Sequence, residues 1–257
     1  MTIISADTSA APQSPSSNAS AITYGSGPAV QRAVADARDQ LLRVAADEFE
    51  IEPSDLEIVE GVVRPRGSPE TGRPVAEFAR ELSDSFGGMH PPVEGHAATA
   101  HSVLAQSVAG HLAHVRVDAE TGSVELLAYA VVQDVGRALN PALVEGQMMG
   151  GAVQSIGRAL YEELIHDDHG QLLTGTFLDY AVPRATVLPP IDTLIVEIPA
   201  PEGPFGAKGI GEASILPGPA AIANAIAAAT GLRMRELPMT ARHIWAAMKT
   251  MEAPPTQ

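Results

Sequence analysis

The sequence predicts a mixed fold of helices and strands, of the α/β or α+β class. Three patterns indicate it. Apolar residues recur at helical spacing over 28–49, apolar and polar residues alternate over 109–134, and a β-branched strand at 191–198 precedes an Ala-rich helix at 219–230. With 257 residues, the chain can bury a sizeable core in one large domain or two small ones.

The composition limits the classes of function. Asp and Glu number 31 against 16 Lys and Arg, and the net charge of −15 disfavours nucleic acids and anionic membranes as partners. The absence of cysteine excludes a disulfide framework, a cysteine nucleophile and thiolate-held zinc or iron–sulfur within the chain. No run reaches the roughly 18 apolar residues of a membrane span. Because residues 1–20 also lack a leader pattern, we expect a cytoplasmic protein.

The first hundred residues predict a tail, two helices and a hairpin. Residues 1–26 are small and polar, which is typical of a flexible tail. An amphipathic helix is expected over 28–49, followed by a short hairpin at 56–63 that turns at Glu60-Gly61. Residues 74–82 predict a short helix with proline in its first turn.

A longer hairpin is expected between 109 and 134, with its turn at 118–122. Each of its strands should place alternate side chains on one face. The side chains expected to share a face are Ala113, Val115 and Val117 in the first strand, and Val124, Leu126, Ala128 and Ala130 in the second.

Asn140-Pro141 should begin a helix that runs to about residue 164, because Asn suits the N-cap and Pro the first helical position. Each interior glycine costs a helix about 1 kcal/mol relative to alanine. A helix tolerates that cost where another group packs very close to it. The interior glycines are Gly146, Gly150, Gly151 and Gly157.

The C-terminal part predicts a strand at 191–198 and a helix at 219–230 that ends at Gly231. A last amphipathic helix is expected over 238–249. Its inward side chains should be Ile244, Trp245 and Met248.

The segment 204–214 is the most informative for chemistry, because it combines three glycines with a single Lys208 and a single Glu212. Glycines let backbone N–H groups approach a ligand, and a partly desolvated carboxylate acts as a general base. Lys208 is followed by Gly209 rather than Ser or Thr, which excludes a phosphate-binding P-loop, and the glycine spacing does not match a dinucleotide fingerprint. The alternative is a surface loop in which Glu212 only favours the start of the next helix.

Two further groups of side chains have competing interpretations. Gln147 and Gln154 lie seven residues apart on one helix face. They could hydrogen-bond to the edge of a heterocycle, or they could lie at the edge of a close helix–helix contact. The histidines are also candidate metal ligands. His111 and His114 point to opposite faces of a strand, and the turn 166–170 is typical of a solvated loop, so we assign no metal ligand.

Taken together and in order, several short segments resemble the molybdenum hydroxylase family, which includes xanthine dehydrogenase, aldehyde oxidase and aerobic carbon monoxide dehydrogenase. The similarity is to the C-terminal part of the large, molybdopterin-binding subunit. It extends over nearly the whole chain, from Ala6-Asp-Thr8 and Tyr24-Gly25 through Asp118–Gly122, Gln133–Gly136, Glu145–Gln154 and Gly209–Glu212 to the final helix.

The resemblance implies that residues 1–257 form part of a molybdopterin-binding domain, the second cofactor domain of the family, and that the first cofactor domain is absent. It implies that Glu212 is the catalytic base, and that Gln147 and the backbone of Gly211 contact the cofactor. Ala19 and Ser20 match a small-residue segment that touches the cofactor and lines the substrate pocket. On this reading, part of the apparent tail is an ordered wall.

The resemblance also implies cofactors and partners. Molybdenum–molybdopterin, in its cytosine dinucleotide form, would be shared with a chain that carries the first domain, while 2Fe-2S clusters and FAD would lie on other subunits. The assembly would hydroxylate an aldehyde or an N-heterocycle carbon of a small-molecule substrate with oxygen from water. The chain would then be a split subunit or a truncated product. The alternative is a non-catalytic remnant or an assembly protein of the same fold.

Overall fold

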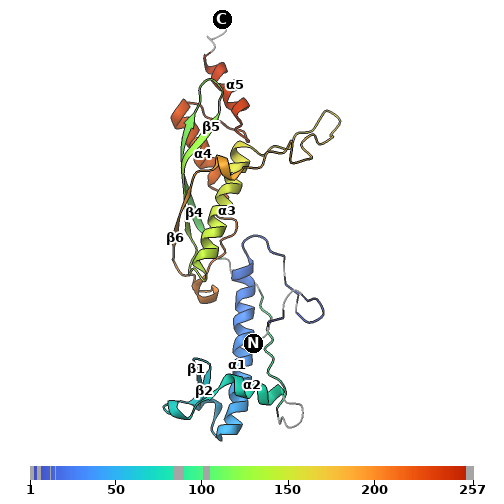
Figure 1. The fold of residues 1–257 in the computed structure, drawn as a ribbon, viewed down its shortest axis with the longest axis vertical. Helices are drawn as coiled ribbons and strands as arrows, with labels where there is room; N and C mark the ends of the chain where they lie inside the picture. The colour runs from blue at the N-terminus through green and yellow to red at the C-terminus, as the bar shows by residue number, and fades with distance from the viewer. Residues whose placement is uncertain are drawn as a thin grey trace. The chain divides into compact units, whose positions relative to one another are not determined.

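A computed structural model describes residues 3–4, 7–11, 13–14, 16–83, 90–100 and 105–252. The chain divides into two compact units (Figure 1). The first lies within residues 1–15 and 25–102, and the second within 16–24 and 103–257. Among the described helices, none combines the length and apolarity needed to cross a membrane.

The first unit packs two helices around a small antiparallel sheet. Its elements are α1 (Ile22–Phe49, whose first three residues belong to the second unit), β1 (Leu56–Val59), β2 (Val62–Pro65), β3 (Arg73–Pro74) and α2 (Val75–Ser83). The predicted hairpin is confirmed, and Gly61 adopts φ +77° at its turn. Buried side chains from α1, the sheet and α2 form one cluster, which includes Leu42, Leu56, Val63 and Phe78.

Helix α1 begins six residues before the predicted start at Pro28. Proline has no backbone N–H and removes one hydrogen bond when it lies inside a helix. The sequence analysis therefore placed Pro28 at the start of the helix. The helix nevertheless continues through it. The prediction of a flexible tail is therefore wrong for residues 22–26.

The second unit has a three-stranded sheet with helices on one face (Figure 1). Its elements are β4 (Val108–Val117), β5 (Val124–Asp134), α3 (Pro141–Leu160), β6 (Ile191–Val196), α4 (Gly218–Thr230) and α5 (Ala241–Glu252). The strand order is β4-β5-β6, with β4 antiparallel and β6 parallel to β5. This arrangement confirms the mixed fold class.

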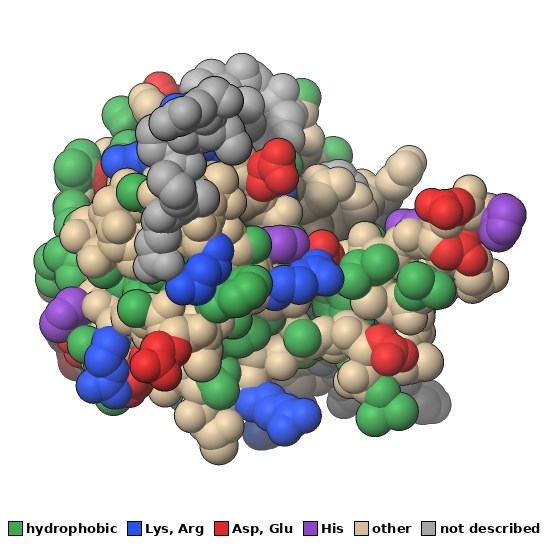
Figure 2. Space-filling view, turned by 90° about the horizontal axis from the view of Figure 1, so that it is seen from above, with side chains coloured by type: hydrophobic (Ala, Val, Ile, Leu, Met, Phe, Trp, Pro, Cys, Tyr) green, Lys and Arg blue, Asp and Glu red, His purple; other side chains and the backbone are tan. Residues whose placement is uncertain are grey.

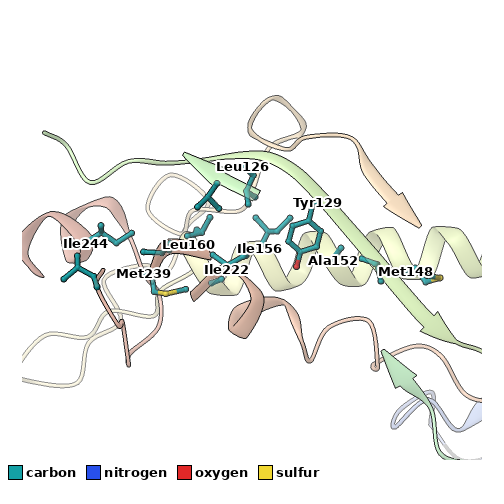
Figure 3. Close-up of a cluster of buried hydrophobic side chains, with 14 of the residues drawn as sticks. Leu126, Tyr129, Met148, Ala152, Ile156, Leu160, Ile222, Met239 and Ile244 are labelled. Carbon is teal, nitrogen blue, oxygen red and sulfur yellow. The ribbon is translucent and has the colours of Figure 1, made fainter. Parts of the chain in front are cut away.

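The core of the second unit fills the space between the sheet and the helices. Met148, Ala152 and Ile156 of α3 lie in one buried cluster with Tyr129 of β5, and Ile222 joins them from α4 (Figure 3). The spacing of the α3 residues by four keeps them on one face of the helix. This buried face fixes how α3 lies against β5, and so where its N-terminus is placed.

The alternation predicted for strand β5 is interrupted by a β-bulge. A bulge lies opposite His114 and Val115, which pair with Ala128 and Leu126, so that Leu127 is an extra residue. Because a bulge shifts the period-two pattern by one, the buried side chains change from Leu126 to Tyr129, Val131 and Gln133. The expectation that Ala128 and Ala130 face the core with Leu126 is therefore wrong.

Helix α3 begins as predicted and ends earlier. The Asn140 side chain accepts a hydrogen bond from the backbone N–H of Leu143 at 3.2 Å, and Pro141 occupies the first position. The helix stops at Leu160 rather than near 164, because the N–H groups of Tyr161 and Glu162 both turn back to the carbonyl of Gly157.

Replacing Asn140 by Ala should lower the free energy of unfolding by about 1 kcal/mol, because the helix start loses its side-chain acceptor. Asn140→Asp keeps an acceptor and is the matched control. Urea unfolding of the two variants checks the prediction, and an equal loss in both would contradict the capping role.

The last helix begins and ends three residues later than predicted, at Ala241 and Glu252, and it differs from the prediction at one of the three expected inward side chains. Ile244 is fully buried and Met248 packs against the core, whereas Trp245 is 43% exposed. The backbone of Trp245 lies over the turn at Gly122, where a Cβ would come within 2.6 Å of the Trp245 nitrogen.

Candidate functional site

The candidate site forms at the carboxyl ends of β5 and β6. Because these strands are parallel, the segments that follow them leave the sheet at the same edge. Backbone hydrogen bonds join the two segments: Arg137 N–H donates to the Gly206 carbonyl at 2.9 Å, and Lys208 N–H donates to the Val135 carbonyl at 3.0 Å. The Gly-rich loop predicted from sequence is therefore anchored to the end of β5.

Asp134, the last residue of β5, is the polar centre of this junction. Its Oδ2 accepts a hydrogen bond from Lys208 Nζ at 2.5 Å, and its Oδ1 accepts from the backbone N–H groups of Gly136 and Ile198. Burial acts to raise the pKa of the Asp134 carboxyl group. The hydrogen bonds, led by that from Lys208, outweigh burial and hold the pKa below its ordinary value.

Gln133 makes a second connection from the buried face of β5. Its side-chain Nε2 donates to the carbonyl of Ile210 at 3.1 Å, and the residue is fully buried. The amide thus holds the loop two residues before Glu212.

Residues 16–24 belong to the second unit and pack against the same loop. Ser20 Oγ accepts a hydrogen bond from the backbone N–H of Glu212 at 2.8 Å, although the two residues are 192 positions apart. A Cβ at Gly209 would lie 2.0 Å from the Ser20 carbonyl oxygen, so only glycine fits there. The predicted flexible tail is therefore an ordered part of the site at these residues.

The backbone of this segment is strained. Ala19 and Ser20 have φ values of +49° and +55°, in the left-handed region that residues other than glycine rarely adopt. Each such residue costs of order 1 kcal/mol, and strained residues of this kind cluster at functional sites. The strain falls on the two residues that the resemblance placed in the pocket wall.

An open pocket of about 530 Å³ lies between these segments and the start of α3. Gln147 lines it from α3, and Gly211 and Glu212 line it from the loop. A Cβ at Gly211 would come within 3.6 Å of both Gln147 Nε2 and Ser20 Oγ, so the glycine leaves space beside these two polar atoms. The structure thus brings Ala19, Ser20, Gln147, Gly211 and Glu212 to one pocket.

Glu212 itself is exposed, and its carboxylate has no hydrogen bond or ion pair within the described part of the chain. Its backbone, by contrast, is fixed by Ser20. The side chain is therefore placed at the pocket and remains available for a ligand or a proton.

Sequence reasoning missed several polar residues that line the pocket, and two of them lie at the start of α3 or just before it. Arg137 and Asn140 line the same pocket, and the N-terminal turn of α3 opens towards it. A helix N-terminus and a guanidinium both favour a negatively charged group. Arg137 directly follows Gln133–Gly136 and Asn140 begins α3, and this position between two recognised segments was the signal that could have identified them.

The other candidates lie elsewhere. Gln154 is exposed and does not line the pocket. The ring Nδ1 of His111 lies 2.8 Å from the Tyr129 hydroxyl, and burial lowers the pKa of His111. Among the described residues, no cluster of three or more His, Asp or Glu side chains is placed to hold a metal ion.

Comparisons with known proteins agree on one family. A family model described as a molybdopterin cofactor-binding domain matches residues 1–189, which include Ser20 and Gln147 and end before Glu212. The chain is 32% identical to the 6-hydroxypseudooxynicotine dehydrogenase complex subunit gamma of Paenarthrobacter nicotinovorans, over 95% of this chain and 31% of that protein. It is 35% identical to the nicotine 6-hydroxylase large subunit of the same organism, over 87% of this chain and 28% of that one.

Among solved structures, quinoline 2-oxidoreductase from Pseudomonas putida 86 is similar with a TM-score of 0.81 and 32% identity. The similarity covers 91% of this chain and 30% of that one. The chain therefore spans 28–31% of the length of these relatives.

Proposed function

The chain belongs to the family of molybdopterin cofactor-binding domains, and on that premise we propose that it is part of the large subunit of a molybdenum hydroxylase and forms one wall of its active site. The observation that carries the proposal is the meeting of Ser20, Gln147, Gly211 and Glu212 at one pocket. These residues come from three distant parts of the sequence. We infer that they converge because they bind a shared ligand.

The pocket residues fit a cofactor of this kind. The space beside Gly211 is bordered by Gln147 Nε2 and Ser20 Oγ, which can hydrogen-bond to the polar edge of a pterin. Gln147, Ser20 and Ala19, with the backbone of Gly211, would hold the cofactor, which we propose to be the cytosine dinucleotide form. When bound, the molybdenum cofactor supplies the two-electron redox chemistry of the reaction.

Glu212 is the proposed general base. The hydrogen bond from its N–H to Ser20 fixes the main chain, and its unpaired carboxylate can accept a proton at the pocket. Hydroxylation converts a substrate C–H bond and water into C–OH: a C–O bond forms from the water oxygen, the C–H bond of the same carbon breaks, and two electrons and two protons are released. The electrons would pass to the cofactor, and one of the protons comes from the water-derived oxygen. The carboxylate of Glu212 would take that proton.

The proposed substrate class is an aromatic N-heterocycle. Two of the relatives are named for nicotine and quinoline, which both contain a ring nitrogen. A carbon next to such a nitrogen is electron-poor and so is open to attack by oxygen. Aldehydes, whose carbonyl carbon is also electrophilic, are the second substrate class.

Exposed apolar side chains on the chain indicate that a further protein binds to it. Apolar side chains lie exposed between charged ones on the face seen in Figure 2. Phe177 and Leu178 of the second unit are 88% and 97% exposed. Large apolar side chains exposed together often mark an interface. We propose that the first cofactor domain covers part of this surface, and that iron–sulfur and FAD subunits complete the assembly.

The proposal is tested by purifying the tagged chain, with whatever it binds, from cells that express it naturally. Molybdenum is measured by mass spectrometry and the pterin by the fluorescence of its oxidised form. We expect molybdenum and pterin in equal amounts, about one of each per chain, together with iron and flavin. A stable assembly or monomer that contains neither molybdenum nor pterin would favour the non-catalytic remnant.

A further inference from the structure

Asp134 and Lys208 form a buried ion pair that the proposed function does not yet use. They lie 74 residues apart, and their contact joins the end of β5 to the loop that carries Glu212. The Asp134 and Lys208 side chains are 11% and 10% exposed. The Arg116–Glu125 pair on the same sheet is 68% and 56% exposed, which is typical of a surface pair with little effect.

A buried pair of this kind costs desolvation energy, so it holds only where the surrounding geometry is well fixed. Here the geometry is fixed from both sides. The second oxygen of Asp134 accepts N–H groups from Gly136 and Ile198, so a single carboxylate ties three backbone segments together. Lys208 is held at its own backbone by the carbonyl of Val135.

The junction leaves no room for the loop to move towards the sheet. Gly136 has φ +67°, and a Cβ there would lie 2.3 Å from the Gly206 carbonyl oxygen and 2.9 Å from the Lys208 nitrogen. Beyond Lys208, Gln133 holds the carbonyl of Ile210, and Ser20 accepts the N–H of Glu212. Successive anchors therefore fix every second residue from Lys208 to Glu212.

We propose that Asp134 and Lys208 are positioning residues for Glu212: their buried ion pair sets the path of the loop so that the Glu212 carboxylate lies at the pocket beside Gln147. The catalytic consequence rests on the function proposed for Glu212. The geometric part rests only on the contacts described above.

Hydrogen exchange in the purified protein, in whatever assembly it forms, tests the geometric part. Lys208→Met removes the charge and keeps the length of the side chain. We expect the amides between Gly206 and Glu212 to exchange at least about tenfold faster, while α3 and β4 keep their wild-type rates. Lys208→Arg should restore part of the protection. Glu125→Gln, which breaks the exposed pair on the same sheet, should change nothing in the loop.

If Lys208→Met does not fold, the double variant Asp134→Asn with Lys208→Met removes both charges and leaves no unpaired buried charge. It should show the same faster exchange confined to the loop. Unchanged loop exchange in the variant that folds, or equal acceleration throughout the chain, would overturn the positioning role.

Kinetics test the catalytic part, with nicotine and quinoline as probes. A displaced catalytic group costs up to about 10²-fold in rate. We expect kcat to fall by at least about tenfold in Lys208→Met, with KM within about twofold and molybdenum content unchanged. Faster loop exchange with unchanged kcat in an active assembly would refute the link to Glu212 and leave the loop anchor intact. Absence of molybdenum from the wild-type assembly would instead refute the proposed function.

Discussion

Replacing Glu212 by Gln is expected to lower turnover by about 10²–10⁴-fold, which is the usual contribution of a general base. Glutamine has nearly the shape of glutamate and cannot accept the proton. The carboxylate has no structural partner within the described chain, so its loss should leave the fold and the cofactor content intact. Turnover is measured with the probe, nicotine or quinoline, that the wild-type assembly oxidises faster.

The matched control for this variant is Glu202→Gln. Glu202 is exposed on the same connection between β6 and α4 and does not line the pocket. It should keep wild-type turnover, and molybdenum per chain should be equal in all three proteins. Turnover within a factor of a few of the wild type in Glu212→Gln would remove Glu212 from the mechanism.

Replacing Gly151 by Ala is expected to destabilise the protein by about 1–3 kcal/mol, the usual cost of overpacking a core. A Cβ at this position would lie 2.0 Å from Ser214 Oγ and 2.8 Å from Ser214 Cβ, and Ser214 is fully buried. Helix α3 and the loop after Glu212 would have to separate. The change in the free energy of unfolding is measured by urea denaturation.

The neighbouring glycine gives the control. A Cβ at Gly150 would have no neighbour within 4 Å in the described structure, so Gly150→Ala should stabilise the helix by up to about 1 kcal/mol. Effects of opposite sign at adjacent positions would show that contact, rather than helix propensity, explains Gly151. Equal effects in the two variants would contradict the close packing of α3 on the loop.

The local elements could be predicted where a residue type enforces a conformation. Asn140-Pro141 starts α3, Gly61 turns the first hairpin and Gly231, with φ +77°, ends α4, because each has a specific backbone preference. The bulge at Leu127 could not be predicted, since nothing in an alternating apolar strand marks the extra residue. The close contacts expected at the α3 glycines occur at Gly151 and Gly157, and not at Gly146 or Gly150.

The site depended on contacts between distant residues, which periodicity cannot reveal. Glu212 and the Gly-rich loop were found from composition alone. The ion pair between Asp134 and Lys208 joins the segments that leave the sheet where β5 and β6 end at the same edge, and the hydrogen bond between Glu212 and Ser20 joins residues 192 positions apart. The family resemblance pointed to Ala19 and Ser20, whose polar, small-residue segment otherwise reads as a tail.

The most direct measurement of the central claim is to locate molybdenum in a crystal of the natural assembly by X-ray anomalous scattering at the molybdenum absorption edge. The account predicts a peak at the pocket lined by Ser20, Gln147 and Gly211, with the Glu212 carboxylate within hydrogen-bond reach of the metal's ligands. A molybdenum peak remote from this pocket, or a Glu212 side chain directed into solvent in the complete assembly, would contradict it.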